Sequence, residues 1–374
     1  MKIAFLCKRQ YMSKDVILDK YARLYEIPNQ LALLGHHVEC FCLSYQSHSE
    51  GRWDESNESK TLVWHSKSYK GVKKVGLITY PILLLQRLKK IQPDVIVAAS
   101  DIPHIAWGAW CARKLNIPFV ADLYDNFEGF GQAKILGMKT LLRKAVCRAD
   151  LITTTSQPLA ELVKHAYGAQ GKVISMPSTV DTKIFVSNNK SEAKKLLGLQ
   201  SDCIYIGTAG GLYRDKGVDV IYQAWKIIEK HMPNVHLVIA GPYNDNCPPP
   251  EGERVHYLGS LTHSKIAMLF QALDVGIISI LDTPFGRYCF PQKAYEMLAC
   301  QLPVVVANVG EMNYLFKQTP QSLFEAGNAQ DLANKLMKQI QSPVQNHVFI
   351  EDWTGVIQQI EPHISSLKES FRLS

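Results

Sequence analysis

Short apolar runs alternate with segments in which apolar residues recur every three or four positions, from residue 2 to residue 168. The short runs are rich in β-branched residues and predict buried strands, whereas the longer segments have the period of an amphipathic helix. The alternation therefore predicts βα units around a parallel sheet. The predicted strands are KIAFLC (2–7), HVECFCL (37–43), DVIVAAS (94–100), PFVADLY (118–124) and LITTT (151–155), and the predicted helices are 23–35, 81–91, 104–115, 139–149 and 159–168.

A polar stretch at 172–193, which contains Pro177, interrupts this alternation. Strand-like runs then return at 203–209, 236–241, 275–280 and 303–308, with helical segments at 220–231, 265–273 and 294–300. We therefore expect two α/β domains, at 1–180 and 181–347, with the boundary near Pro177 to Asn188. The final segment, 348–374, has helical periodicity, and it lies either across the face between the domains or back on the first domain.

Length and composition agree with two folded domains. The chain has 374 residues, 47% of them apolar and 20% charged, which is typical of a globular protein. Nine cysteines without a C-x-x-C pair favour a reducing compartment. No signal-peptide pattern opens the sequence, and the apolar run Val75 to Leu88 is too short to cross a bilayer. These features predict a cytoplasmic protein.

The net charge of +7 is unevenly distributed, because residues 1–180 carry +9 and the remainder carries −2. A basic first domain attracts anionic lipid, nucleic acid or phosphorylated substrates, or is simply well solvated. Two segments, 68–90 and 134–149, combine cations with helical apolar periodicity. Each is either an amphipathic helix that lies on an anionic membrane or an ordinary surface helix packed on its own sheet.

The familiar nucleotide motifs are missing. The turn after the first strand, CKRQYMSKD, has no glycine and so lacks G-x-G-x-x-G, and neither a P-loop nor a D-x-D pair occurs in the chain. Dehydrogenases, kinases and transferases that hold the nucleotide through a metal are therefore disfavoured. We predict no metal site.

The first strand of the second domain ends in a different turn, GTAGGLYRDKG. Gly207, Gly210 and Gly211 leave backbone amides accessible, and Arg214 and Lys216 stand just before the next helix. Backbone N–H groups at a helix N-terminus together with two cations suit a diphosphate. The alternative is an ordinary strand-to-helix turn with surface cations.

A second candidate lies at Pro291 to Val305, PQKAYEMLACQLPVV. Pro291 is expected to open a helix, with Lys293 in its first turn and Glu296 three residues later. The lysine can pair with phosphate, and the carboxylate can accept both ribose hydroxyls. Alternatively the two form an exposed i, i+3 ion pair, worth about 0.2 to 0.5 kcal/mol.

With these stretches the sequence resembles the family 4 glycosyltransferases, retaining nucleotide-sugar enzymes of the GT-B fold. Three patches carry the resemblance: G-x-L-x-x-x-K-G at Gly210 to Gly217, V-x-Y-L-G at Val255 to Gly259, and P-x-K-x-x-E-M-L-A-C-x-x-P-V-V at Pro291 to Val305. Less specific matches occur in the first domain, including ADLITTTSQPLAELVK at 149–164.

The resemblance implies two Rossmann-like, doubly wound domains that face each other across a cleft. The second domain would hold a nucleotide diphosphate-sugar of the UDP or GDP type as co-substrate, without a metal or another cofactor. Glu296 would bind the ribose, Lys216 the diphosphate, and the backbone of Tyr257 and Leu258 the base. The donor-binding residues expected on this basis are Gly210, Gly211, Arg214, Lys216, Tyr257, Leu258, Arg287, Tyr288, Pro291, Lys293 and Glu296.

Two positions depart from the family pattern. Tyr288 stands where the first glutamate of the family's E-x7-E pair would be, and that carboxylate normally contacts the transferred sugar. Gly211 stands where an arginine is common, so Arg214 is expected to supply the second phosphate contact.

Ligands of open α/β sheets bind at the carboxyl ends of the strands, which directs attention in the first domain to residues after 94–100 and 118–121. We expect Asp122 and Asp125 to be catalytic, either stabilising a cationic transition state or taking the acceptor proton. Asp101, His104 and Tyr124 are expected on the acceptor side. The alternatives are structural: Asp101 is better explained as a helix cap, Asp125 is either, and His104 is better explained as a packed histidine.

Three cations follow the first strand, Lys8, Arg9 and Lys14. They either meet an acceptor phosphate or are exposed loop residues, and the second description is the simpler one.

Together these patterns predict a retaining, metal-independent glycosyltransferase that moves a sugar to the hydroxyl of a glycan or lipid-linked acceptor in cell-surface polysaccharide or glycolipid synthesis. The expected location is cytoplasmic, with a peripheral contact at the inner face of the membrane through the basic domain, and no nucleic-acid partner is expected. Two alternatives remain, a GT-B-fold sugar-nucleotide epimerase and a non-catalytic partner subunit that binds a nucleotide sugar.

Overall fold

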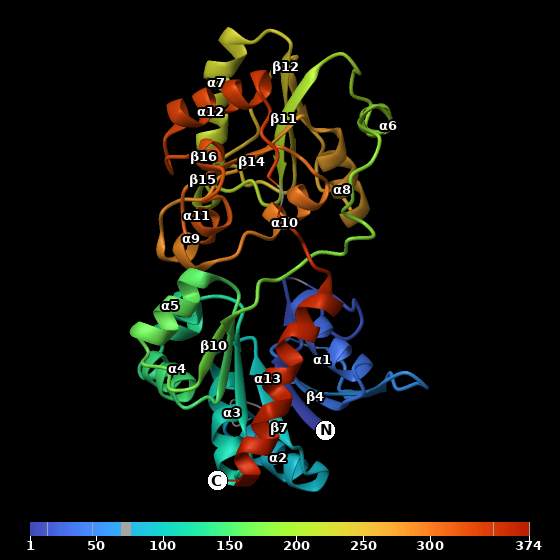
Figure 1. The fold of residues 1–374 in the computed structure, drawn as a ribbon, viewed down its shortest axis with the longest axis vertical. Helices are drawn as coiled ribbons and strands as arrows, with labels where there is room; N and C mark the ends of the chain where they lie inside the picture. Colours follow the sequence, from blue (N-terminus) through green and yellow to red (C-terminus); the bar gives the residue numbers. More distant parts are fainter. Residues whose placement is uncertain (13, 47, 69–75, 347, 374) are drawn as a thin grey trace. The chain divides into compact units, whose positions relative to one another are not determined.

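The computed structural model describes residues 1–12, 14–46, 48–68, 76–346 and 348–373, and it divides into two compact units (Figure 1). Unit 1 comprises Met1–Ser178 together with Trp353–Ser374, and unit 2 comprises Thr179–Asp352. The first boundary falls close to the predicted limit at residue 180. The C-terminal helix is part of unit 1.

Unit 1 is built on a sheet in the order β10-β9-β8-β7-β1-β4-β6-β5, with a separate β2–β3 hairpin. Every pairing in the sheet is parallel except that of β5 with β6. The strands are β1 Lys2–Lys8, β2 Gln10–Tyr11, β3 Lys14–Asp15, β4 His37–Ser44, β5 Gly51–Asp54, β6 Thr61–Ser68, β7 Val95–Ala99, β8 Phe119–Leu123, β9 Leu151–Thr154 and β10 Lys172–Ser175.

Helices connect these strands. They are α1 Ala22–Leu33, α2 Gly76–Ile91, α3 Ile102–Leu115, α4 Met138–Cys147, α5 Gln157–His165 and α13 Trp353–Leu373, with short 3₁₀ turns η2 Phe127–Gly129 and η3 Gly131–Lys134. α13 packs against α1 (Figure 1). Ile357, Ile360 and Ile364 recur at helical spacing and are buried in the same core as Leu24 and Leu31. The apolar stripe of the last helix therefore binds it to unit 1.

Unit 2 has an all-parallel sheet in the order β13-β12-β11-β14-β15-β16. Its strands are β11 Ile204–Ala209, β12 Val235–Ala240, β13 Val255–Tyr257, β14 Val275–Ile278, β15 Val304–Ala307 and β16 Leu323–Phe324. The chain leaves β11 toward β12 on one side and returns to β14 on the other. The carboxyl ends of β11 and β14 therefore form the switch point at which ligands of such sheets bind.

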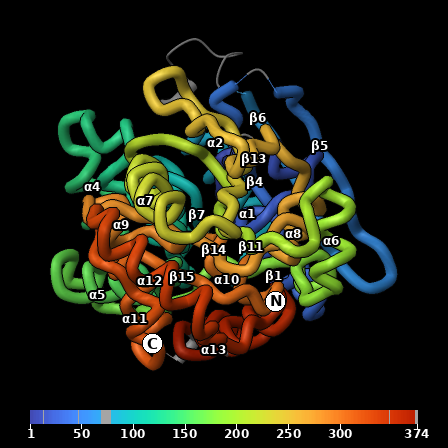
Figure 2. The backbone as a smooth tube through the Cα atoms, turned by 90° about the horizontal axis from the view of Figure 1, so that it is seen from above, coloured from blue at the N-terminus to red at the C-terminus, as the bar shows by residue number. Residues whose placement is uncertain are grey.

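The helices of unit 2 pack around this sheet, with α7 and α12 side by side (Figures 1 and 2). They are α6 Lys190–Leu196, η4 Arg214–Lys216, α7 Val218–His231, α8 His263–Ala272, α9 Pro284–Tyr288, α10 Gln292–Ala299, α11 Glu311–Leu315, η5 Pro320–Ser322 and α12 Ala329–Gln341.

Two sequence-based expectations concern the whole chain. Within the part that the structure describes, no helix combines the length and apolar character needed to cross a bilayer. The nine cysteines are all free thiols, and most of them are buried, as expected for cysteines that act as small apolar side chains.

Candidate functional site

The turn after β11 needs its glycines. Gly210 has φ +117°, and a Cβ built there would lie 3.4 Å from the Lys293 ammonium. Gly217 has φ +75°, and a Cβ there would lie 2.6 Å from the hydroxyl of Ser279, which donates to the Gly217 carbonyl. A side chain at either position would therefore strain the turn or fill the space beside Lys293.

Lys293 lies in the first turn of α10, as predicted, with its Nζ 3.5 Å from Oγ1 of Thr208 near the end of β11. Burial lowers the pKa of Lys293 to about 8, an effect that Glu296 opposes and Lys216 reinforces. Among the described residues, no carboxylate forms an ion pair with Lys293. The switch point therefore holds a half-buried ammonium that forms no ion pair with a described carboxylate, although Glu296 is close enough to act on its charge.

The other predicted cations lie on two short elements. Arg214 and Lys216 belong to η4 and are exposed, and the Lys216 Nζ is 3.6 Å from the centre of the Phe285 ring. Arg287, on α9, instead pairs with Asp282 through two contacts of 2.5 and 3.1 Å. Arg287 is therefore already neutralised, whereas Arg214 and Lys216 have no ion-pair partner among the described residues. Tyr288 ends α9 and is half-buried.

Glu296 is one turn along α10 from Lys293, and its side chain is only 15% exposed. Its Oε1 lies 3.8 Å from Nε2 of His263, and it does not pair with Lys293. The alternative of a simple i, i+3 surface pair is therefore wrong for these residues. The carboxylate retains acceptor capacity for hydroxyl donors.

The remaining donor-side predictions lie near the end of β13 and at the start of α10. The Leu258 amide donates to Ile239 inside the sheet, so only its carbonyl remains available to a ligand. The Tyr257 hydroxyl donates to the Gly241 carbonyl at 2.9 Å. Pro291 is the N-cap of α10 and not its first helical residue, a difference of one position.

In unit 1, Asp122 is buried and pairs with Arg23, which is equally buried. Three hydrogen bonds join the guanidinium to the carboxylate, at 2.5, 3.0 and 3.1 Å, and Thr153 Oγ1 donates to it at 2.6 Å. Arg23 also donates to the Met176 carbonyl at 2.6 Å, just before unit 1 ends. This geometry gives Asp122 a positioning role, because its oxygens already serve protein donors. Sequence reasoning missed Arg23. The signal that could have identified it is its position as a single arginine among the apolar residues of α1.

Asp101 is the N-cap of α3, so the capping prediction is confirmed. It accepts from the backbone and from Nδ1 of His104, at 3.0 and 2.6 Å, and from the Tyr45 hydroxyl at 2.9 Å. His104 is fully buried, as expected for a packed histidine. This trio is part of the interior of unit 1.

Asp125 and Tyr124 follow β8 and are both half-buried. The neighbouring Asn126 caps η2, so Asp125 does not. The Tyr124 hydroxyl donates to the Ser100 carbonyl at 2.9 Å and lies 2.9 Å from Lys8 Nζ. Burial lowers the pKa of Lys8. Lys8, Tyr124 and Asp125 are therefore predicted first-domain groups that are only partly buried.

The simpler description of the three cations after the first strand is wrong for Arg9. Its side chain is fully buried, lies 2.9 Å from Asp15 and stacks over Trp53 at 4.5 Å. The β2–β3 hairpin pairs Asp15 with Gln10, which brings the Asp15 carboxylate beside Arg9, and the paired charge allows burial. Lys14 is exposed.

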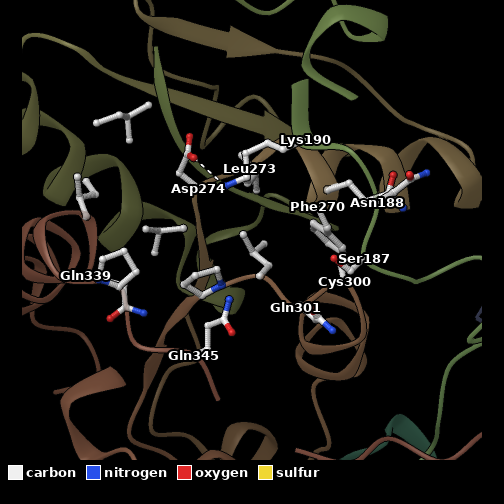
Figure 3. Close-up of a pocket in the computed structure, with 17 residues that line it drawn as sticks. Ser187, Asn188, Lys190, Phe270, Leu273, Asp274, Cys300, Gln301, Gln339 and Gln345 are labelled. Atoms are coloured by element: carbon white, nitrogen blue, oxygen red, sulfur yellow. Dashed lines mark hydrogen bonds and ion pairs between the residues drawn. The ribbon is translucent and has the colours of Figure 1, made fainter. Parts of the chain in front are cut away.

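A hollow of about 500 Å³ in unit 2 lies at the other end of the sheet (Figure 3). Its wall includes the first residues of β11 and β14. Its polar lining residues include Lys190, Asp274 and Gln301. Since Lys293 faces the carboxyl end of β11, this hollow is separate from the candidate site.

The arrangement around Lys293 suits a diphosphate ester that carries a ribose. Cations would bind the phosphates, and Glu296 would accept from sugar hydroxyls. The expectation of accessible glycine amides is wrong for Gly210, whose N–H donates to the Ala240 carbonyl at 3.0 Å, and for Gly207, which is buried within β11. Within the described residues, no group of three or more His, Cys, Asp and Glu side chains could hold a metal ion.

Two protein families match the chain, one over each half. The family described as "Glycosyltransferase Family 4" matches residues 22–184, and the family "Glycosyl transferases group 1" matches residues 203–342.

Curated relatives include a D-inositol 3-phosphate glycosyltransferase of Stackebrandtia nassauensis, 26% identical over 63% of this chain and 55% of that protein. The putative teichuronic acid biosynthesis glycosyltransferase TuaC of Bacillus subtilis is 24% identical over 70% of this chain and 65% of its own length. The chain thus matches between about half and two thirds of the length of these relatives.

Solved structures are similar over the whole chain. HepE of Anabaena, solved in complex with UDP, has a TM-score of 0.71 at 17% identity and covers 98% of this chain and 100% of its own. Sucrose-phosphate synthase of Thermosynechococcus elongatus has a TM-score of 0.69 at 16% identity, over 100% and 98%. The chain has the GT-B fold, which confirms the predicted fold class.

Proposed function

We infer that this chain, which belongs to the family 4 glycosyltransferases, transfers a sugar from a nucleotide diphosphate-sugar to an acceptor hydroxyl. The observation that carries the proposal is the Lys293 ammonium, which lies at the switch point of unit 2 and forms no ion pair with a described carboxylate. A bound diphosphate would provide the missing negative charge. Glu296, one turn further along α10, would then meet the ribose.

The donor is of the UDP or GDP type. Support comes from HepE, a protein of the same fold that was solved in complex with UDP-glucose. Lys216 and Arg214 provide further positive charge on η4, so a diphosphate can be neutralised by side chains without a metal ion. We propose that the anomeric configuration is retained, because the family 4 glycosyltransferases that the chain resembles are retaining enzymes.

Unit 1 would recognise the acceptor. Asp125 is the carboxylate that we propose to take the acceptor proton, because Asp122 is committed to Arg23. Lys8 ends β1 and Tyr124 follows β8, the two strands that flank β7, and both residues would orient the acceptor. We propose a glycan or lipid-linked acceptor used in cell-surface polysaccharide or glycolipid synthesis, met at the inner face of the membrane.

The experiment measures the unfolding temperature with UDP, GDP, ADP and their common sugars. A ligand at 100 times its dissociation constant stabilises a protein by about 2.7 kcal/mol. The variants are Glu296→Gln and, as a matched control on an exposed carboxylate of the same unit, Glu251→Gln. A shift with one nucleotide that Glu296→Gln loses and Glu251→Gln keeps is the expected result.

No shift with any nucleotide, or an equal shift in all three proteins, would overturn the donor site. Sugar transfer is then measured with the bound donor and a set of acceptors. Conversion of the donor sugar without an acceptor would identify an epimerase instead. Donor binding without any turnover would identify a binding subunit.

A further inference from the structure

Three consecutive helices of unit 1 carry cations but no carboxylate. α3 packs against both α2 and α4, so the three form one surface, which we call the α2–α3–α4 layer (Figure 1). The sequence predicted two separate basic segments, and the fold joins them by placing α3 between them. The cations on these helices are Arg87, Lys89, Lys90, Arg113, Lys114, Lys139, Arg143 and Lys144, and no Asp or Glu occurs within their ranges.

These charges are mostly unpaired. Arg143 forms an ion pair with Glu128 at 2.5 Å. For the other seven, the described residues provide no ion-pair partner, and all seven are exposed. If this surface served solubility alone, nothing would disfavour carboxylates close to the exposed cations. A surface with charges of one sign favours a large anionic partner.

Large apolar side chains are exposed on the same layer. Leu136 is fully exposed and Ile135 is 61% exposed, in the loop that leads from η3 into α4. Leu141 on α4 is 45% exposed, and Ile82 and Leu83 on α2 are each 52% exposed. Lys134 and Lys139 flank the loop on both sides, so apolar tips and cations alternate along one segment.

A hollow of about 420 Å³ lies between α3 and α4. Arg113, Lys144 and Arg148 line it beside the Trp110 ring. The one carboxylate in its wall, Asp150, already accepts the Phe119 amide at 2.7 Å. Three cations around a hollow of this kind suit a phosphate headgroup.

We propose that the α2–α3–α4 layer docks on an anionic phospholipid bilayer. Ile135 and Leu136 insert at the boundary between headgroups and acyl chains, and the cations contact the lipid phosphates. The exposed aliphatic side chains favour a bilayer over nucleic acid, which is bound by cations together with aromatic stacking. The inference rests on the proposed function for its purpose, since it would bring unit 1 to a lipid-linked acceptor, but docking needs no turnover.

The experiment is cosedimentation of the full chain with vesicles of phosphatidylcholine alone and with added phosphatidylglycerol. The test variant is Leu136→Ser with Lys139→Glu. The matched control is Leu196→Ser with Lys195→Glu, a neighbouring exposed leucine and lysine on α6 of unit 2. One near-surface cation contributes about a fivefold change in affinity and an inserted leucine more, so the test variant should bind at least about tenfold more weakly.

We expect the protein to bind the anionic vesicles only and to be released from them by salt. Binding should be weaker in the test variant and unchanged in the control. Equal binding by wild type and test variant would overturn the proposal, as would equal loss in both variants or a preference for single-stranded RNA over the vesicles. The unfolding shift with the donor is measured on the same proteins. A donor shift without vesicle binding would refute only the docking, and vesicle binding without a donor shift would refute only the donor site.

Discussion

The two units use charged residues at the carboxyl ends of their strands in opposite ways. In unit 1, Asp122 is bound by Arg23 and Asp101 is bound by His104 and Tyr45. In unit 2, Lys293 is half-buried, and among the described residues its ammonium has the Thr208 hydroxyl within hydrogen-bond distance but no carboxylate within ion-pair distance. The same edge of the same kind of sheet is therefore closed by internal ion pairs in one unit and left with an unpaired cation in the other.

This difference separates architecture from binding. A buried charge costs stability unless another charge or a set of hydrogen bonds compensates it. Compensation from within marks a residue that holds the fold. A charge that no protein group pairs with indicates a residue whose partner is a bound ligand.

The largest expected effect comes from breaking the pair in unit 1. Asp122→Asn leaves the Arg23 guanidinium buried without its counter-charge and should lower the free energy of unfolding by about 3 to 5 kcal/mol, measured by urea denaturation. Replacing both partners, as Arg23→Leu with Asp122→Leu, should recover part of the loss. A stable Asp122→Asn protein that binds the donor but does not turn over would instead place this carboxylate in the chemistry.

The second effect is on ligand affinity in unit 2. Lys293→Met should weaken nucleoside diphosphate binding by about 2 kcal/mol, roughly thirtyfold, because a charged hydrogen-bond donor is lost. The same substitution should not lower stability, since it removes an uncompensated buried ammonium. Calorimetric titration and urea denaturation measure the two quantities. Unchanged affinity, or a large loss of stability, would contradict the comparison between the units.

The third effect is a pH dependence with opposite signs for folding and binding. The pKa of Lys293 is about 8 in the folded chain and 10.5 when unperturbed, so the unfolded state binds more protons between these values. The contribution of Lys293 to stability should therefore rise by on the order of 2 kcal/mol from pH 8 to 10.5.

Donor affinity should instead fall above pH 8, as the ammonium loses its proton. Urea denaturation and calorimetric titration across this range, with Lys293→Met as the reference protein, measure the two trends. If both trends have the same sign, or if Lys293→Met retains them, Lys293 is not the titrating group.

The smallest effect compares Asp125 with Asn126, which lie next to each other after β8. Asn126→Ala removes the cap of η2 and should cost about 1 kcal/mol, whereas Asp125→Asn should leave stability nearly unchanged. Asp125→Asn should nevertheless lower the rate of sugar transfer. A cost in stability for Asp125→Asn, without an effect on transfer, would make it a structural residue.

Most of the fold could be predicted from local patterns. The β-branched runs that became β1, β4, β7, β8 and β9 are buried on both faces and therefore nearly continuous in hydrophobicity. Strand β6, next to the edge strand β5, was missed, because TLVWHSKS mixes polar and apolar residues. The β2–β3 hairpin is too short to have a periodicity.

The chain alone indicated the succession of βα units and the position of the interruption near Pro177, because each of these is written in neighbouring residues. The spacing of Lys293 and Glu296 is local in the same way, but their contacts Thr208 and His263 come from distant segments. Only the tertiary structure decided what happens to individual charges. Arg23 meets Asp122 across 99 positions, and α3 joins two basic segments into one surface. Whether a charge is compensated depends on residues distant in sequence, and no local pattern contains that information.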